Sequence, residues 1–250
     1  MKIILPVMLM ALALPAVAQS HPTSDTDKAV PAYVTNAISD PARRADKADD
    51  SRRQMAAVMT FTGIKPGDKV LELVPGSGYW TRVFNAIVGP KGHVYTVWPN
   101  EFANKSYANW QKLVATPHFA NVSLLKQPIA ELDVPAQVDL VYTSQNYHDY
   151  HGRMDIVAFN KTVYEALKPG GLYVIIDHVA SAGSGASDAD TLHRIDPELV
   201  KKDVEAAGFI FGGANDALRN QDDPHTVSVS DDSVRGHTDQ FIYRFRKPAQ

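Results

Sequence analysis

The fold of this chain follows from one segment, Leu71-Glu-Leu-Val-Pro-Gly-Ser-Gly-Tyr-Trp-Thr81. A short apolar run of strand type, Lys69–Val74, precedes the two glycines, and Tyr79–Val88 follows with the pattern of a helix. Gly76 and Gly78 lack side chains, so the backbone can turn sharply here and approach a ligand closely. The segment therefore predicts a strand, a glycine turn and a helix in succession.

The same alternation continues on both sides of this unit. Repeated strand–helix units predict an α/β fold with a doubly wound sheet and right-handed crossovers. Asp196 as cap and Pro197 as first helical residue open a helix that we expect to run to about Ala207. We expect further strands at His93–Trp98, Val122–Lys126, Val138–Thr143, Leu172–Ile176, Phe209–Phe211 and Gln240–Arg246, and further helices at Asp50–Phe61, Glu101–Ala115 and Met154–Leu167.

Length and composition limit the class of protein. The 250 residues suit one large domain, and 44% hydrophobic residues allow a folded core. The net charge of −3 shows no electrostatic footprint for nucleic acid, so we expect no nucleic-acid partner. The chain has no cysteine, which excludes disulfides, thiolate metal sites and cysteine nucleophiles.

The N-terminus has the pattern of a secretory signal peptide. Lys2 precedes the apolar run Ile3–Val17, and Ala16-Val-Ala18 fits a cleavage site. The run is shorter than the roughly 20 residues that cross a bilayer. We therefore expect an exported, periplasmic protein with no stable membrane insertion after cleavage. The predicted parts are a signal peptide (1–18), a flexible lead-in (19–34) and a single domain (35–250).

The glycine turn does not match two well-known motifs. A dinucleotide fingerprint would need a third glycine where Thr81 stands, which disfavours NAD. Ser77 lacks the spacing of a nucleophile elbow. A tight strand–helix connection without any ligand stays open as an interpretation of the turn alone.

The order of segments resembles the class I S-adenosylmethionine-dependent methyltransferases, in particular a group of predicted exported methyltransferases. The resemblance implies a Rossmann-like, seven-stranded sheet that is mostly parallel with an antiparallel C-terminal strand. It implies S-adenosyl-L-methionine as methyl donor, with Glu72, Gly76 and Gly78 facing its amino-acid end and Ser77 in the same cofactor-binding loop. It runs from Ile38 to Phe245 and is carried by Val70–Arg82, Gly92–Tyr95, Asp139–Asp149, Ala166–Gly171 (with the turn Leu167-Lys-Pro-Gly-Gly171), Leu192–Pro197 and Glu205–Phe209.

The chain departs from the family pattern at two positions. Val74 stands where the pattern has its first glycine. Trp98 stands where an acid at the end of the second strand would grip the ribose hydroxyls of the donor. We assign Trp98 to the cofactor site by position, with Asn100 or Glu101 as substitutes for the missing acid.

The richest polar cluster is Asn146-Tyr-His-Asp-Tyr-His151, in the loop after the fourth predicted strand. Ligands in such sheets bind beyond the carboxyl ends of the strands, so we place Asn146 at the cofactor. We assign His148 as general base and Asp149 as its orienting partner, with His178 or simple proximity as alternatives. His148, Asp149, His151 and His178 also offer donor atoms for a metal, but no third ligand is fixed by sequence, and we assign none.

Two functions from different classes follow. The first is S-adenosylmethionine-dependent methyl transfer to a small-molecule acceptor. The alternative is a non-catalytic exported binding protein that retains the fold, since the supply of donor outside the cytoplasm is not obvious. The long polar segment Arg219–Asp239 predicts a functional or disordered loop.

Overall fold

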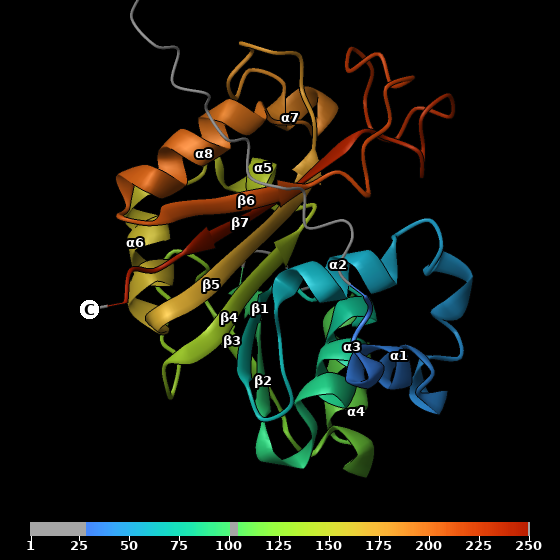
Figure 1. Ribbon diagram of the computed structural model, residues 1–250. Helices are drawn as coiled ribbons and strands as arrows, with labels where there is room; N and C mark the ends of the chain where they lie inside the picture. Colours follow the sequence, from blue (N-terminus) through green and yellow to red (C-terminus); the bar gives the residue numbers. More distant parts are fainter. Residues whose placement is uncertain (1–28, 101–104, 250) are drawn as a thin grey trace, which may run out of the picture.

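A computed structural model describes residues 29–100 and 105–249 of the protein (Figure 1). The predicted signal peptide, most of the predicted lead-in and Glu101 lie outside the described residues.

A seven-stranded sheet forms the centre of the molecule. Its strand order is β3-β2-β1-β4-β5-β7-β6. β7 runs antiparallel to both of its neighbours, and the pairs among β1 to β5 are all parallel. The predicted α/β class and the mostly parallel sheet are confirmed. The strands are β1 Lys69–Leu73, β2 His93–Pro99, β3 Val122–Gln127, β4 Val138–Ser144, β5 Leu167–His178, β6 Ile210–Asn215 and β7 Gln240–Arg246.

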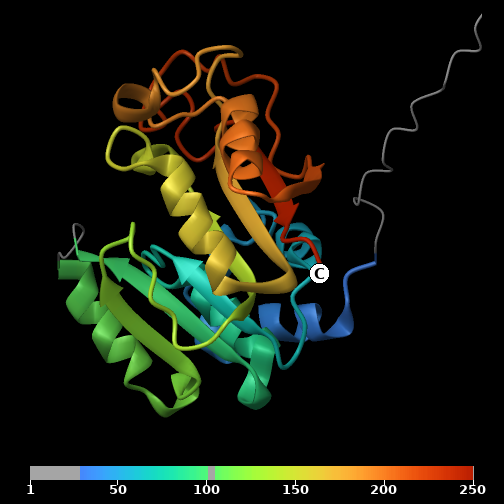
Figure 2. The ribbon, with the colours of Figure 1, turned by 90° about the vertical axis from the view of Figure 1, so that its left-hand side faces the viewer.

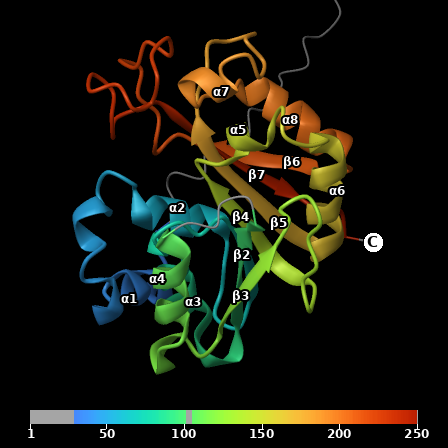
Figure 3. The ribbon, with the colours of Figure 1, turned by 180° about the vertical axis from the view of Figure 1, so that it is seen from behind.

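Helices cover both faces of the sheet, as Figure 1 and Figure 3 show from opposite sides. One buried core joins the sheet to α1 Ala32–Ile38, α2 Met55–Thr62, α3 Tyr79–Val88 and α4 Lys105–Val114. The other core joins it to α5 Tyr147–Tyr150, α6 Ile156–Ala166 and α8 Pro197–Ala206. A further one-turn helix, α7, spans Ala189–Leu192, and 3₁₀ turns lie at Pro41–Arg43, Lys47–Asp49, Gly89–Lys91 and Pro117–Phe119. None of the described helices is long and apolar enough to span a membrane.

Local signals set several of these boundaries. α3 begins directly after Gly78, whose φ of +80° suits a residue without Cβ. α8 begins as predicted, because the Asp196 carboxylate accepts the backbone N–H of Glu198 at 3.0 Å and Pro197 takes the first helical position.

Two expected boundaries at the N-terminal end differ from the structure. α1 begins at Ala32 and buries Val34 completely, so the predicted boundary of the lead-in at residue 34 falls inside a helix. α2 begins at Met55 rather than Asp50, because Gln54 has a φ of +47° that no α-helix continues through.

Two expected loops also contain regular structure. Lys168-Pro-Gly-Gly171 extends β5 instead of turning before it, since Gly170 and Gly171 exchange backbone hydrogen bonds with Lys247. The polar loop after β4 contains the single helical turn of α5.

The segment between β6 and β7 is ordered by buried ion pairs. Arg194, which follows α7, donates from both terminal nitrogens to Asp223 at 2.9 and 3.0 Å, and both side chains are fully buried. Asp239 accepts from Arg219 at 2.8 Å and faces His225 at 3.0 Å. Figure 2 shows this orange-to-red segment beside the end of α7. Of the two alternatives given for it, the disordered loop is therefore wrong.

Candidate functional site

The strands bring four loops to one edge of the sheet. The register pairs Leu73 of β1 with Thr143 of β4, and Ser144 of β4 with Ile176 of β5. His178 at the end of β5 pairs with Gln240 at the start of β7. The loops that follow β1, β4 and β5 therefore share this edge with the segment that precedes β7, as expected for a ligand site of a doubly wound sheet.

The glycine loop after β1 has a left-handed backbone at three positions. The φ values are +54° at Val74, +55° at Gly76 and +80° at Gly78. Val74 thus keeps the conformation that glycine favours, although it is β-branched. The departure from the family pattern at this position lies in the side chain and leaves a glycine-like backbone in place.

The two glycines of the loop do different things. A Cβ on Gly76 would meet nothing within 4 Å, whereas a Cβ on Gly78 would lie 2.2 Å from the Trp110 ring of α4. The space that Gly78 leaves is therefore filled by Trp110, not open to a ligand as predicted. A cavity of about 330 Å³ lies beside this loop and is lined by Gly76, Ser77, Arg82, Asn109, Trp110 and Leu113.

Glu72 lies beneath the glycine loop and is only 1% exposed. Its carboxyl group accepts the hydroxyl hydrogen bond of Thr81 in α3. Burial raises the pKa of Glu72 to about 8, against the lowering effect of the Thr81 hydrogen bond. The position predicted for the methyl donor's amino-acid end thus holds a carboxyl group that is enclosed by the fold.

The end of β2 gives no open carboxylate among the described residues. Trp98 is 3% exposed, and its ring packs 5.7 Å from that of Tyr107 in α4. Asn100 is exposed just after the strand, while Glu101 lies outside the described residues. Trp98 therefore packs under a helix and does not present its ring to solvent.

The loop after β4 contains a buried polar group at the same sheet edge, the side chain of His148. Asn146 precedes α5 and donates from Nδ2 to the Ser144 carbonyl at 2.6 Å. His148, 3% exposed, donates its backbone N–H to Asp177 Oδ2 at 2.8 Å. Its ring Nδ1 lies 2.8 Å from Asp177 Oδ1, and an ionised carboxylate can only accept, so Nδ1 carries the proton.

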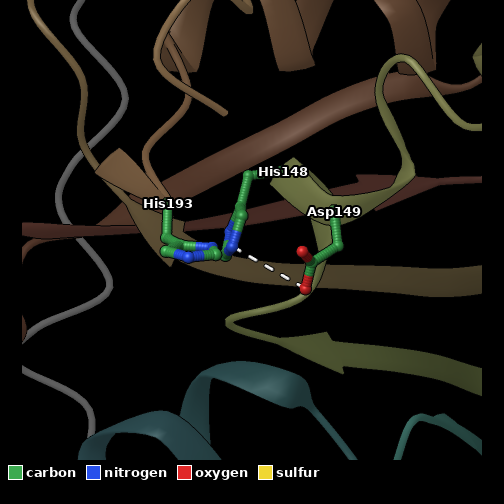
Figure 4. Close-up of side chains that lie close together, drawn as sticks. All are labelled: His148, Asp149 and His193. Atoms are coloured by element: carbon green, nitrogen blue, oxygen red, sulfur yellow. Dashed lines mark ion pairs between the residues drawn. The ribbon is translucent and has the colours of Figure 1, made fainter. Parts of the chain in front are cut away.

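Asp177 of β5, not Asp149, orients the His148 ring. Asp149 Oδ2 lies 3.7 Å from Nε2, the other ring nitrogen, and Asp149 Oδ1 lies 3.6 Å from Arg153. The orienting role predicted for Asp149 is therefore wrong in geometry. Asp149 faces the reactive side of the ring instead, as Figure 4 shows.

Electrostatics couple His148 to Asp177. Burial alone would lower the pKa of His148, but the charge and hydrogen bond of Asp177 hold it above its ordinary value. Burial would likewise raise the pKa of Asp177, and the His148 ring lowers it. Nδ1 thus keeps its proton against Asp177, and Nε2 is the ring nitrogen that gains or loses a proton.

Of three other histidines near this edge, two form contacts within the fold and one lies beside His148. His151 Nε2 lies 3.0 Å from Asp203 of α8, away from His148. His178 Nδ1 pairs with Thr238 at 2.8 Å, and burial lowers the pKa of His178 to about 4. His193, after α7, packs its ring 5.4 Å from the His148 ring (Figure 4). The sequence analysis assigned no role to His193 or to Asp177.

Comparisons with known proteins show similarity to methyltransferases of several kinds. The family model of protein-L-isoaspartate(D-aspartate) O-methyltransferase (PCMT) matches residues 16–126. A protein-L-isoaspartate O-methyltransferase of Methanococcus aeolicus is 28% identical over 62% of this chain and 65% of its own length. A ubiquinone/menaquinone biosynthesis C-methyltransferase of Vibrio vulnificus is 26% identical over 66% of this chain and 63% of its own length. The chain spans less than two thirds of the length of these curated relatives.

Solved structures share the fold. A SAM-dependent methyltransferase from Aquifex aeolicus superposes with a TM-score of 0.55 at 19% identity, covering 86% of this chain and 98% of its own. The [4+2]-cyclase SpnF superposes with a TM-score of 0.60 at 16% identity, covering 80% and 82%. The strand order and the antiparallel last strand are those of a class I methyltransferase fold. Together with the sequence matches, they show that the chain has the class I methyltransferase fold and is similar to S-adenosylmethionine-dependent methyltransferases.

Proposed function

We propose that this protein transfers the methyl group of S-adenosyl-L-methionine to a small-molecule acceptor. The observation that carries the proposal is the Asp177-oriented His148 ring at the edge that the glycine loop also reaches. A chain that kept only the scaffold would have no need to bury a histidine against a carboxylate at this place.

The glycine loop fits a methyl donor in part. Gly76 and Ser77 are exposed and line the cavity beside the loop, which has a volume within the range of small-molecule sites. These two residues and the nearby Arg82 would hold the donor. The donor supplies a sulfonium methyl that is already activated, so the protein needs mainly to align it with the acceptor.

His148 would take the proton of an acceptor hydroxyl or amine. Because Nδ1 donates to Asp177, the lone pair of the neutral ring lies on Nε2. Removal of a proton by a positioned imidazole typically contributes about 100- to 10,000-fold to the rate.

A second cavity supports a small acceptor. It has a volume of about 550 Å³ and lies between the segment before α2 and the two ends of the segment that joins β6 to β7. It shares Arg52, Leu218 and Gln240 with a smaller hollow that Ser144 and Gln145 line at the end of β4. A concave site of this size at the functional edge suits a small molecule.

Export completes the proposal. The signal-peptide pattern of residues 1–18 predicts a mature protein that begins at Gln19 in the periplasm or an equivalent space. N-terminal mass spectrometry of the protein isolated from its native cells should find Gln19 first. An intact Met1 on protein from the cytosolic fraction would contradict it.

Calorimetric titration of the purified protein with S-adenosylmethionine and with its demethylated product tests donor use. We expect both to bind, and we expect the demethylated product to accumulate when a suitable small hydroxyl or amine acceptor is added. If neither nucleoside binds, the alternative of a non-catalytic exported binding protein becomes the better account.

The match to the PCMT family model favours one second candidate, O-methylation of isoaspartyl residues in proteins. The acceptor would then be a carboxylate oxygen, which carries no proton at neutral pH and needs no base. An isoaspartyl peptide that is methylated equally by the parent and by His148→Ala would support this candidate over the first. The match ends at residue 126, before His148.

A further inference from the structure

We infer that His148, Asp149 and His193 bind a divalent transition-metal ion. One donor atom from each residue lies within 4.8 Å of the other two. Figure 4 shows the two imidazoles and the carboxylate converging from α5 and from the residue that follows α7. His193 takes the place that His151 and His178 do not fill, because those two pair with Asp203 and Thr238.

The spacing suits one ion. Metal–nitrogen and metal–oxygen bonds of about 2.0–2.2 Å put two donor atoms of one ion about 3 to 4 Å apart. His148 Nε2 and Asp149 Oδ2 are 3.7 Å apart, which is too long for a hydrogen bond but right for two ligands of a shared ion. The His193 donor nitrogen lies within 4.8 Å of both other donor atoms, and the side chain is exposed, so its ring has room to turn toward a shared ion.

Asp177 prepares His148 for this role. Histidines that bind metals commonly donate their other ring N–H to a carboxylate, which fixes the tautomer and the orientation of the ring. Asp177 accepts both Nδ1–H and the backbone N–H of His148 at 2.8 Å, so Nε2 points away with its lone pair free. The fold thus provides a fixed first ligand and its supporting carboxylate.

The backbone at His193 is held in an unusual conformation. His193 has a φ of +55°, and such values at residues other than glycine cluster at functional sites. Its neighbours fix it: Arg194 is locked against Asp223, and the Leu192 carbonyl accepts the backbone N–H of Val229. These contacts hold an exposed imidazole over His148.

Charge and ligand chemistry select the kind of ion. Asp149 and Asp177 bring two negative charges to the cluster, and Arg153 Nη2 lies 3.6 Å from Asp149 Oδ1, whereas Asp149 Oδ2 is the oxygen nearest His148 Nε2. Two imidazoles and one carboxylate suit zinc, iron, nickel or manganese better than magnesium or calcium, which prefer oxygen ligands. Three protein ligands leave a position open for a further molecule.

The inference deepens the proposed function and rests on it for the use of the ion, though not for its binding. An acceptor hydroxyl bound at the open position would lose its proton more readily, because a bound cation lowers the pKa of its oxygen ligand. The ion would then activate the acceptor in place of Nε2 of His148, and the acceptor's proton would leave to solvent water.

Titration of the chelator-treated protein with Zn²⁺, followed by calorimetry, tests the site. We expect one equivalent to bind, with at least a tenfold loss of affinity in His193→Ala and in Asp149→Asn. Asp177→Asn should cost about 10- to 100-fold, as a supporting partner does. Co²⁺ titration should give visible absorption bands that His193→Ala removes.

His118→Ala is the matched control, because His118 is exposed, lies 3.5 Å from Asp40 and is not part of the cluster of His148, Asp149 and His193. Its affinity for Zn²⁺ should equal that of the parent. Absence of binding by Zn²⁺, Ni²⁺ and Mn²⁺, or equal binding by parent and His193→Ala, would overturn the site. Donor binding is measured separately with S-adenosylmethionine, so failure of the metal site and failure of the proposed function give different results.

Discussion

The half of the chain that contains the glycine loop and the half that contains His148 use their polar groups differently. In residues 29–100 the candidate site groups serve the fold: Glu72 is held by Thr81, Gly78 makes room for Trp110, and Trp98 packs under α4. In residues 127–249, His148 and Asp177 are buried together at a strand edge. The PCMT family model covers the first half and stops at residue 126.

The strand, glycine turn and helix of the first half form a backbone frame that relatives can share. The His148–Asp177 pair of the second half is a site that depends on the side chains of this chain. A backbone turn that approaches a ligand depends on φ values and on small residues, and many sequences satisfy those needs. A histidine whose one nitrogen is fixed by a buried carboxylate depends on two particular side chains, here one from α5 and one from β5. The first half is therefore the part that matches the family model, whereas the chemistry toward the acceptor must be tested on this chain.

The largest expected effect concerns the second half. With a proton-bearing acceptor, His148→Ala should lower turnover by about 100- to 10,000-fold while donor affinity stays the same, because the change lies outside the glycine loop. The rate at which the demethylated product is released measures turnover, and calorimetric titration with the donor measures donor affinity.

His151→Ala is the control for that experiment, since His151 faces Asp203 of α8 instead of the His148 cluster. Its turnover should stay close to the parent's. If His148→Ala turns over at the parental rate, His148 takes no part in the reaction, and the contrast between the two halves is wrong.

Gly78 and Gly76 test the frame in the first half. Gly78→Val should lower the free energy of unfolding by about 4 kcal/mol, because it combines a left-handed φ with a clash against Trp110. Gly76→Val carries only the strain of its φ and should cost about 1 to 2 kcal/mol. Urea unfolding measures both.

The double variant Gly78→Val with Trp110→Ala should recover part of the stability that Gly78→Val loses. The clash with the Trp110 ring would be gone, whereas the backbone strain at a φ of +80° would remain. Equal losses for the two glycine variants would contradict the packing of α4 over the loop.

Glu72 adds a pH dependence to the first half. The pKa of Glu72 is raised to about 8 in the folded protein, so the folded state binds more protons than the unfolded state between pH 4.5 and 8. The contribution of this group to stability is therefore present below pH 4.5 and falls as the pH rises, by about 3 kcal/mol between pH 5 and pH 8.

Glu72→Gln should remove this slope, because its amide oxygen can still accept from Thr81 and has no proton to lose. Urea midpoints of parent and variant at pH 5 and pH 8 measure the difference. Parallel pH curves for the two proteins would show that Glu72 ionises normally in the fold.

Local patterns were enough to predict much of the sheet and its helices. The predicted bounds of α3 and β7 match the structure, because glycine turns and apolar runs mark their ends within a few residues. The partnership of His148 with Asp177 was not predicted, since it joins α5 to the end of β5 and depends on how these two elements pack.

The proximity of His193 to His148 was out of reach for a similar reason. It depends on a left-handed residue after α7 and on the ion pair between Arg194 and Asp223, which joins two distant loops. Sequence patterns describe neighbours along the chain, whereas these contacts depend on the packed structure.

The smallest expected effect concerns Val74, where the frame itself departs from the family pattern. Val74→Gly and Val74→Ala remove the same branched methyl groups, so the loss of packing is similar in both. At an ordinary position glycine is less stable than alanine by about 0.5 to 1 kcal/mol. At a φ of +54° the order should invert, because a Cβ in the left-handed region costs about 1 to 2 kcal/mol. We expect Val74→Gly to exceed Val74→Ala in free energy of unfolding by about 1 kcal/mol in urea titrations. If alanine is the more stable of the two, the turn after β1 does not need a glycine-like backbone, and the first half would lose the feature that makes it a shared frame.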